Sequence, residues 1–364
     1  MSDFKIYSKQ FIKIIITFLK GNYIYIHKKI KIDLDKNKKY AFIFFAADYD
    51  NLGDIAITLA QEKFLKECLG KNYQIIKITE SEAYSAVKVI KKLDKEEVLI
   101  TLIGGGNNGS LYEFIEAPRR FVLWKLKDYK IVSFPQTVTF ENNVKATLYE
   151  KVFAKLCNRC SDLLLVAREK ESYMKYKDIQ KNRVLLTPDI VFSLDNNKNT
   201  LRKSNDVAFI MRDDKEKAID LKKQEQLLAL TKQKDRNIYF WDTCNIKYKE
   251  NAEYDLLEDF IVKLRKVKFA VTDRLHGMIL CYITRTPCIV IENNNGKIQS
   301  TYETWLADQN FICLYDHKER VEKYIQLMEY MESLEDVYAK NLNDEFGLLK
   351  SALEETSYEK SSIN

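Results

Sequence analysis

From Tyr40 onward, short apolar segments alternate with longer segments whose apolar residues recur at helical spacing. Five apolar, β-rich segments in the first half predict buried strands: Tyr40–Ala47, Tyr73–Thr79, Val98–Ile103, Lys130–Phe134 and Leu163–Val166. Helical patterns stand between them, and one of these is Ile55–Leu69. Strands that alternate with helices are typical of a doubly wound α/β sheet.

The polar segment Asp195–Asp206 has no periodic apolar residues and predicts a linker between two domains. A second alternating set follows, with strands expected at Val207–Met211, Asn237–Trp241, Phe269–Val271 and Phe311–Leu314, and helices near Asp220–Thr231, Tyr254–Lys266, Arg320–Glu332 and Leu334–Glu354. We therefore predict an α/β protein with two doubly wound, Rossmann-like domains facing a cleft. The expected division is an N-terminal segment at 1–38, domains at 39–195 and 206–320, and closing helices at 321–364.

The N-terminal apolar segment, Phe11–Leu19, is too short to span a bilayer, and Lys13 interrupts it. Lysines flank it on both sides, which is typical of an amphipathic helix on an anionic membrane surface. The alternative interpretation, which we favour, is a helix that packs its apolar face on the body of the protein. No small-residue cleavage site follows the segment, so we do not expect a secretory signal peptide.

Charge and cysteine content limit the kinds of binding partner and the cellular compartment that we expect. The net charge of +6 is spread along the 364 residues, which suits anionic small molecules or an anionic membrane surface. No basic run with interleaved aromatic residues indicates a nucleic-acid partner. Seven scattered cysteines predict a reducing cytoplasm, and Cys157 and Cys160 lie in a helical pattern that favours a structural role.

Polar and glycine-rich segments follow the strands of the first half, at Asn51–Asp54, Gly104–Asn107 and Pro135–Thr137. In an α/β sheet such segments meet outside the carboxyl ends of the strands, where ligands bind. The glycines allow backbone N–H groups to approach a ligand, although a tight turn needed only for packing is the alternative. We expect Asp54 to cap the helix that follows. Asp48-Tyr49-Asp50 has the form of a metal-binding pair, but we interpret it as a turn and expect no metal site.

The segment Phe269–Trp305 holds the most informative chemistry. Its strand is followed by Thr272-Asp273 as the predicted N-cap, which places Arg274 and His276 in the first turn of a helix. Together with the N–H groups of that turn, a guanidinium and an imidazole make a receptor for a phosphate or carboxylate. In the alternative, Asp273 pairs with Arg274 and His276 is a packed core residue.

Six motifs in order resemble the polysaccharide pyruvyl transferase family, and the likeness runs from about Tyr40 to about Leu314. They are NLGDIAI (Asn51–Ile57), GGGNNGSLY (Gly104–Tyr112), FPQT (Phe134–Thr137), ARE (Ala167–Glu169), TPD (Thr187–Asp189) and TDRLHGMILCYITRTPCIVI (Thr272–Ile291), the last followed by Gly296-Lys297 and Tyr302–Trp305. The resemblance implies the two-domain GT-B glycosyltransferase architecture. It also implies transfer of pyruvate from phosphoenolpyruvate to two hydroxyls of a sugar, as a ketal, in a bacterial exopolysaccharide, biofilm or capsule precursor.

The resemblance also assigns expected roles. Arg274, His276 and Arg212 match donor-binding positions, and we expect His276 to act on the departing phosphate because imidazole titrates near neutral pH. Asp54 is the expected hydroxyl base, and Lys297 is expected to close over the phosphate. The other expected substrate-binding residues are Asn51, Gly53, Gly104, Gly105, Gly106, Asn107 and Gln136. No cofactor is expected beyond phosphoenolpyruvate itself.

Two alternatives stay open: a nucleotide-sugar glycosyltransferase of the same architecture, and a non-catalytic protein of a polysaccharide assembly complex. The expected location is the cytoplasm or, as a peripheral protein, the inner face of the membrane. A lipid-linked acceptor is compatible with either location.

Overall fold

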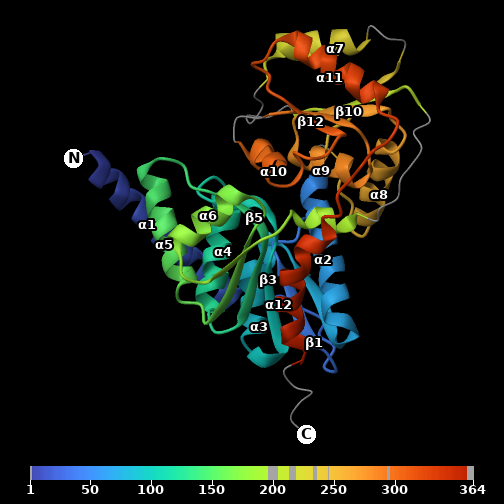
Figure 1. Ribbon diagram of the computed structural model, residues 1–364. Coiled ribbons are helices and arrows are strands. Elements are labelled where there is room, and N and C mark those ends of the chain that lie inside the picture. Colours follow the sequence, from blue (N-terminus) through green and yellow to red (C-terminus); the bar gives the residue numbers. More distant parts are fainter. Residues whose placement is uncertain are drawn as a thin grey trace. The chain divides into compact units, whose positions relative to one another are not determined.

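The computed structural model describes residues 2–195, 204–212, 219–232, 236–244, 246–292 and 296–358 (Figure 1). Contacts divide the chain into two compact units. The first takes in the chain up to Ala47, then Ile57–Ile190, and the chain from Glu345 onward. The second combines Asp48–Ala56 with Val191–Asp344. The predicted linker, Asp195–Asp206, lies mostly outside the described residues, and the domain boundaries expected from the sequence stay predictions.

The first unit contains a parallel sheet that has seven strands among the described residues, in the order β2-β1-β3-β5-β6-β7, with β4 paired to β5. The strands are β1 (Lys39–Phe44), β2 (Tyr73–Ile78), β3 (Val98–Leu102), β4 (Gly105–Gly109), β5 (Lys130–Thr139), β6 (Asp162–Ala167) and β7 (Arg183–Leu186). The helices are α1 (Ser2–His27), α2 (Leu52–Leu69), α3 (Ala83–Ile90), α4 (Glu113–Lys125), α5 (Val144–Cys157), α6 (Lys170–Ile179) and α12 (Gly347–Tyr358).

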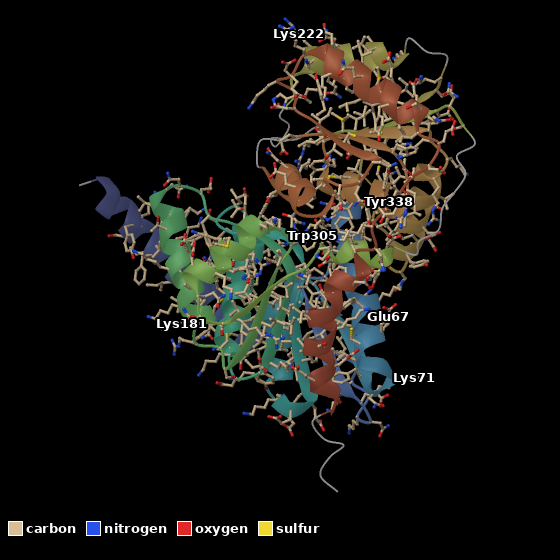
Figure 2. The ribbon with its side chains drawn as sticks, in the orientation of Figure 1. Glu67, Lys71, Lys181, Lys222, Trp305 and Tyr338 are labelled. Atoms are coloured by element: carbon tan, nitrogen blue, oxygen red, sulfur yellow. The ribbon has the colours of Figure 1, made fainter. Side chains whose placement is uncertain are left out.

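Helices cover both faces of this sheet, with α2 and α12 on one side and α3, α4, α5 and α6 on the other (Figure 1). Phe64 of α2 contacts both Phe134 of the sheet and Phe346 before α12. Glu67, on the same helix, points to solvent (Figure 2). The central strands β1, β3, β5 and β6 are almost wholly buried because helices lie over both faces, which explains their continuous apolar sequences.

The second unit has a five-stranded parallel sheet among its described residues, in the order β12-β11-β10-β8-β9. Its strands are β8 (Val207–Ile210), β9 (Ile238–Phe240), β10 (Phe269–Thr272), β11 (Cys288–Ile291) and β12 (Ile312–Tyr315). Its helices are α7 (Leu221–Lys232), α8 (Glu253–Leu264), α9 (Leu275–Ile283), α10 (Lys297–Trp305) and α11 (Val321–Ser333). One core cluster joins the sheet to α7 and α11, and α8, α9 and α10 lie on the other face (Figure 1). The predicted α/β class with doubly wound parallel sheets is confirmed.

The glycine-rich segment was predicted to be a turn. In the structure Gly105–Gly109 forms the short strand β4. Its partner β5 continues through Pro135 to Thr139, five residues beyond its predicted end. The register with β6 shifts between Ser133 and Gln136, next to this proline. A proline donates no ladder hydrogen bond, so its place at an irregularity lets β5 continue and pair with β4.

The predicted helix Leu334–Glu354 is wrong in its first part, because residues 334–342 are not helical. Side chains of a neighbouring turn bind this backbone instead: Asn310 Oδ1 accepts from Tyr338 N, and Gln309 Oε1 accepts from Lys340 N. These tertiary hydrogen bonds replace the helical ones that the local sequence favours. The predicted closing segment 321–364 is also divided, with α11 in the second unit and α12 in the first.

Candidate active site

The candidate site of the second unit lies at a reversal in strand order. From β8 the chain goes to β9 on one side and then returns to β10 on the other side of β8. In open α/β sheets, ligands bind outside the carboxyl ends of the strands at such a switch point. Arg212 follows β8 and Asp273 follows β10, and Arg212 N donates a 2.8 Å hydrogen bond to Asp273 Oδ1. The topology therefore places the predicted donor-binding segments next to each other.

The helix after β10 begins differently from the prediction. Arg274 is itself the N-cap, with extended backbone, and α9 starts at Leu275. Thr272 Oγ1 accepts from Arg274 N at 3.1 Å, while the carboxylate of Asp273 binds the end of the neighbouring strand. Asp273 does not cap the helix because its Oδ1 bonds to Arg212 N instead. His276 stays in the first turn, as predicted.

The guanidinium of Arg274 is almost buried, and it is held by the loop after β9. Its Nη2 lies 3.0 Å from Asp242 Oδ1, and its Nη1 donates to Cys244 Sγ at 2.7 Å. Arg274 therefore forms this ion pair with Asp242, whereas the alternative interpretation expected a pair with Asp273. Sequence reasoning missed Asp242, although it follows a predicted strand, as the other candidate residues do. A carboxylate that orients the guanidinium is typical of a preorganised anion site.

His276 packs directly against the first turn of α2. A Cβ atom added to Gly53 would lie 2.2 Å from His276 Nδ1, so no larger residue fits there without moving the imidazole. Leu52 N also donates to Thr243 O at 2.7 Å, which ties this turn to the loop that carries Asp242. Gly53 therefore contributes space for a catalytic candidate. Its predicted backbone contact with substrate stays a prediction.

The helix cap predicted at Asp54 is wrong, because Asn51 caps α2. Asn51 Oδ1 accepts from Gly53 N and from Asp54 N, and α2 begins one residue later. Asp54 is a first-turn residue, and its Oδ2 accepts from Tyr49 Oη at 2.9 Å. Burial, followed by the Asp54 carboxylate, raises the pKa of Tyr49, so the tyrosine stays a donor. The proposed role of Asp54 as a base thus no longer competes with a capping role.

In the acidic pair Asp48 and Asp50, the second carboxylate binds a backbone amide, because Asp50 Oδ1 accepts a hydrogen bond from Tyr248 N at 2.7 Å. Within the described residues, no group of three or more histidine, cysteine or acidic side chains is placed to hold a metal ion. Cys157 and Cys160, for which the sequence favoured a structural role, are buried free thiols. Burial raises the pKa of the Cys160 thiol to about 12, which makes it unreactive.

Asp273 has the electrostatics of a functional carboxyl, which sequence reasoning missed by assigning it to a cap. Burial raises its pKa to about 6, against the opposing effect of the hydrogen bond from Arg212 N and of the nearby guanidinium groups. A carboxyl that titrates near neutral pH can hold or release a proton at the switch point.

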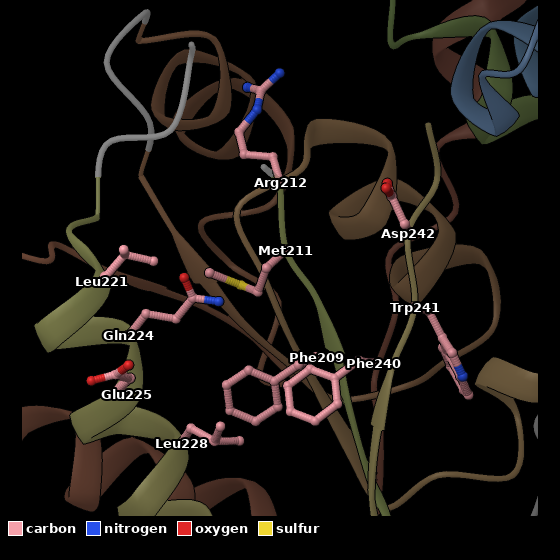
Figure 3. A pocket seen from close by; sticks show the side chains of 10 residues that line it. All are labelled: Phe209, Met211, Arg212, Leu221, Gln224, Glu225, Leu228, Phe240, Trp241 and Asp242. Carbon is pink, nitrogen blue, oxygen red and sulfur yellow. The ribbon is translucent and has the colours of Figure 1, made fainter. Parts of the chain in front are cut away.

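A cavity of about 440 Å³ opens beside these residues, between the ends of β8 and β9 and helix α7 (Figure 3). Arg212 and Asp242 lie at one end of the lining side chains, while Phe209, Phe240 and Leu228 form an apolar group at the other end (Figure 3). Glu225 on α7 adds a carboxylate. An apolar surface next to carboxylates is also what a nucleotide would require, so this cavity bears on the glycosyltransferase alternative.

The candidate residues of the first unit are occupied by contacts within the chain. Gly105 pairs with Gln136 across β4 and β5, and the Gln136 side chain donates to Ile103 O. The buried Arg119 Nη2 donates to Asn107 Oδ1 at 2.5 Å. At Gly104, an added Cβ would lie 2.9 Å from Pro135 O. These contacts show a packing role for the segment, and its substrate contacts, including those of Gly106, stay predictions.

The sequence pattern of the polysaccharide pyruvyl transferase family matches residues 51–295, about two thirds of the chain. The chain belongs to the polysaccharide pyruvyl transferase family. It is therefore a transferase. The matched residues include Asn51 and Gly53 near one end, and Arg274 and His276 near the other.

Two relatives are similar to most of this chain, and one solved structure has a similar fold. General stress protein 30 of Bacillus subtilis is 33% identical over 299 residues, covering 80% of this chain and 85% of that protein. Pyruvyl transferase 1 of Schizosaccharomyces pombe is 31% identical over 291 residues, covering 74% and 70%. An uncharacterised protein of Klebsiella pneumoniae has a similar fold, with a TM-score of 0.51 and 19% identity over 76% of this chain and 93% of that one.

Three motifs of this pyruvyl transferase meet at one buried side chain that sequence reasoning did not select. Arg168 Nη1 pairs with Asp189 Oδ2 at 2.8 Å, and its Nε donates to Thr137 Oγ1 at 2.7 Å. Arg168 belongs to ARE, Asp189 to TPD and Thr137 to FPQT. One guanidinium thus joins the ends of β5, β6 and β7 in the first unit. The opposite charges of Arg168 in ARE and Asp189 in TPD were the sequence signal that could have indicated this ion pair.

Proposed function

We propose that this pyruvyl transferase takes phosphoenolpyruvate as donor and places pyruvate, as a ketal, on two hydroxyls of a sugar in a bacterial exopolysaccharide or capsule precursor. The single observation that carries the proposal is the grouping of Arg212, Asp273, Arg274 and His276 at the switch point of the second sheet. Phosphoenolpyruvate carries a carboxylate and a phosphate close together, so its site needs several preorganised cations and N–H donors.

Each residue has a role in the proposed reaction. Arg274, oriented by Asp242, binds an anionic group of the donor, and Arg212 binds a second one. His276 donates a proton to the departing phosphate oxygen. Asp273 holds the proton that is transferred to the methylene carbon. Asp54 accepts a proton from an attacking sugar hydroxyl, and Lys297, at the start of α10, contacts the phosphate.

The reaction balances without any further reactant. One sugar hydroxyl oxygen bonds to the central carbon of the donor while the methylene carbon gains a proton and becomes a methyl group. The second hydroxyl oxygen then bonds to the same carbon, and the bond from that carbon to the phosphate oxygen breaks. Of the two hydroxyl protons, one replaces the proton given to the methyl group and one leaves with inorganic phosphate.

The test is binding of phosphoenolpyruvate to the purified protein, measured by calorimetry and by the rise in melting temperature. We expect wild type to bind, and Arg274→Lys to bind at least about tenfold more weakly, because lysine cannot form a bidentate fork on a carboxylate. Arg320→Lys is the matched control, since Arg320 is exposed in the same unit. Equal binding of phosphoenolpyruvate by wild type and Arg274→Lys would show that Arg274 does not bind the donor.

A nucleotide-sugar glycosyltransferase is the second candidate, because the cavity beside Arg212 has an apolar side and two carboxylates (Figure 3). The same titration distinguishes the two. Stabilisation by nucleotide diphosphates or nucleotide sugars, with none by phosphoenolpyruvate, would favour the glycosyltransferase. We expect the reverse, because Arg212 and Arg274 follow the neighbouring strands β8 and β10, where their guanidinium groups can bind the two anionic groups of phosphoenolpyruvate.

A further inference from the structure

Helix α1 is attached to the first unit through one of its faces. Ile14 is buried in a cluster with Leu148 and Tyr149 of α5. The ring of Phe18 lies 5.6 Å from that of Trp124 on α4. This helix therefore packs on the body of the first unit, as one of the two sequence interpretations expected.

The opposite face of α1 is also apolar, and it is exposed. Its residues recur at the spacing of one helix face and are Ile12, Ile15, Ile16, Leu19, Tyr23 and Ile26. Leu19 and Tyr23 expose 63% and 65% of their surface. A contiguous exposed patch of large apolar side chains is uncommon on soluble proteins and marks an interaction surface. We call this set of six residues the outer face of α1.

Positive charge lies beside the outer face. Lys9, Lys13 and Lys20 are exposed on the same helix, and Lys28 and Lys29 are exposed directly after it. The sequence contains no acidic residue between Asp3 and Asp33. The partner of this surface must therefore present negative charge together with an apolar layer at about the depth of one side chain.

We propose that the outer face of α1 binds the surface of an anionic lipid bilayer, with its apolar side chains in the headgroup and acyl boundary and its lysines on lipid phosphates. Helices that bind along an anionic bilayer surface have apolar residues on one face and lysines beside them, as α1 does. None of the described helices has the length and apolar character needed to cross a bilayer, so α1 lies along the surface. A second copy of this chain is a poorer partner, because pairing two outer faces brings lysines against lysines.

The proposal goes beyond the proposed function and needs no catalytic readout. The test is sedimentation of the full-length protein with vesicles of phosphatidylcholine alone and with added phosphatidylglycerol. We expect binding to the anionic vesicles that weakens with salt. Leu19→Glu should lower the partition coefficient by about tenfold or more, because a carboxylate replaces an inserted side chain.

Leu348→Glu is the matched control, because Leu348 lies on helix α12 and is exposed to the same 63% as Leu19. A triple change of Lys9, Lys13 and Lys20 to glutamine is an independent variant that leaves the apolar residues in place. We expect it to weaken binding to anionic vesicles on the order of a hundredfold, since each lysine contributes about 1 kcal/mol near such a surface. Melting temperatures of all variants should stay close to wild type.

Three results would overturn the proposal. One is wild-type protein that does not sediment with anionic vesicles, or sediments equally with neutral ones. Another is equal vesicle binding by Leu19→Glu and Leu348→Glu. The third is a dimer in solution that Leu19→Glu dissociates while no vesicle binding is seen, which would identify a second copy as the partner. None of these results would bear on phosphoenolpyruvate binding.

Discussion

Replacing Gly53 by alanine should impair catalysis by displacing His276 while leaving the imidazole present. The added Cβ would lie 2.2 Å from His276 Nδ1, 2.7 Å from Cγ and 3.1 Å from Cβ. Gly53 is in the first turn of α2 and has no positive φ, so alanine fits the backbone. Alanine is favoured over glycine in a helix by up to about 1 kcal/mol. The effect of the substitution is therefore confined to the contact with the histidine.

The size of the displacement follows from these distances. Restoring ordinary contact at 3.4 Å from the present 2.2 Å moves the ring by about 1.2 Å. Rotation of the ring about χ2 does not relieve the clash, because Cγ lies on the rotation axis and is itself only 2.7 Å away. A misplacement of about 1 Å can cost about a hundredfold in rate, or about 2.7 kcal/mol of transition-state stabilisation.

The assay is steady-state pyruvyl transfer from phosphoenolpyruvate, with Gly347→Ala as the control. Gly347 starts α12, and an added Cβ there meets nothing within 4 Å. We expect kcat to fall about a hundredfold in Gly53→Ala and to be unchanged in Gly347→Ala. Adding Gly53→Ala to a His276→Ala background should cost nothing further, because both act through one imidazole. Near-normal kcat in folded Gly53→Ala, or full additivity of the two changes, would refute this reasoning.

The other predictions concern the switch point. His276→Ala should lower kcat more than it raises KM for phosphoenolpyruvate, and an effect confined to KM would indicate simple binding. Asp273→Asn should make the protein more stable than wild type at neutral pH. Because the pKa of Asp273 is raised to about 6 from 3.8, the native state holds the proton more tightly. Wild type therefore loses unfolding free energy as pH rises from about 4 through 6, by at most about 3 kcal/mol. Denaturant titrations of both proteins at pH 4 and pH 7.5 check this, and a pH-independent difference would contradict it.

The alternation of strands and helices, and the position of Arg274 and His276 after a strand, could be predicted from the sequence. Both depend on local patterns: buried parallel strands are continuous apolar segments, and the helix after β10 has its own periodicity. The neighbours of these residues could not be predicted. Asp242 is 32 positions from Arg274, and only the strand order brings their two loops together.

The remaining errors concern where helices begin. Asp54 and Asn51 are both acceptable caps by residue type, and the geometry of the turn selects Asn51. The segment 334–342 has helix-forming residues, yet Gln309 and Asn310 bind its backbone from outside. Turn geometry decides in the first case and tertiary hydrogen bonds decide in the second, and residue type alone indicates neither.

The most direct test of the central claim is the fate of labelled phosphoenolpyruvate. The purified enzyme would be incubated with phosphoenolpyruvate labelled in its carbon skeleton and with saccharide precursors from producing cells that lack this protein. We predict that the label enters the saccharide as an acid-labile ketal, with one inorganic phosphate released for each ketal formed, and that Arg274→Lys transfers little. Saccharide that stays unlabelled with phosphoenolpyruvate but gains a sugar when a nucleotide sugar is supplied would contradict the account.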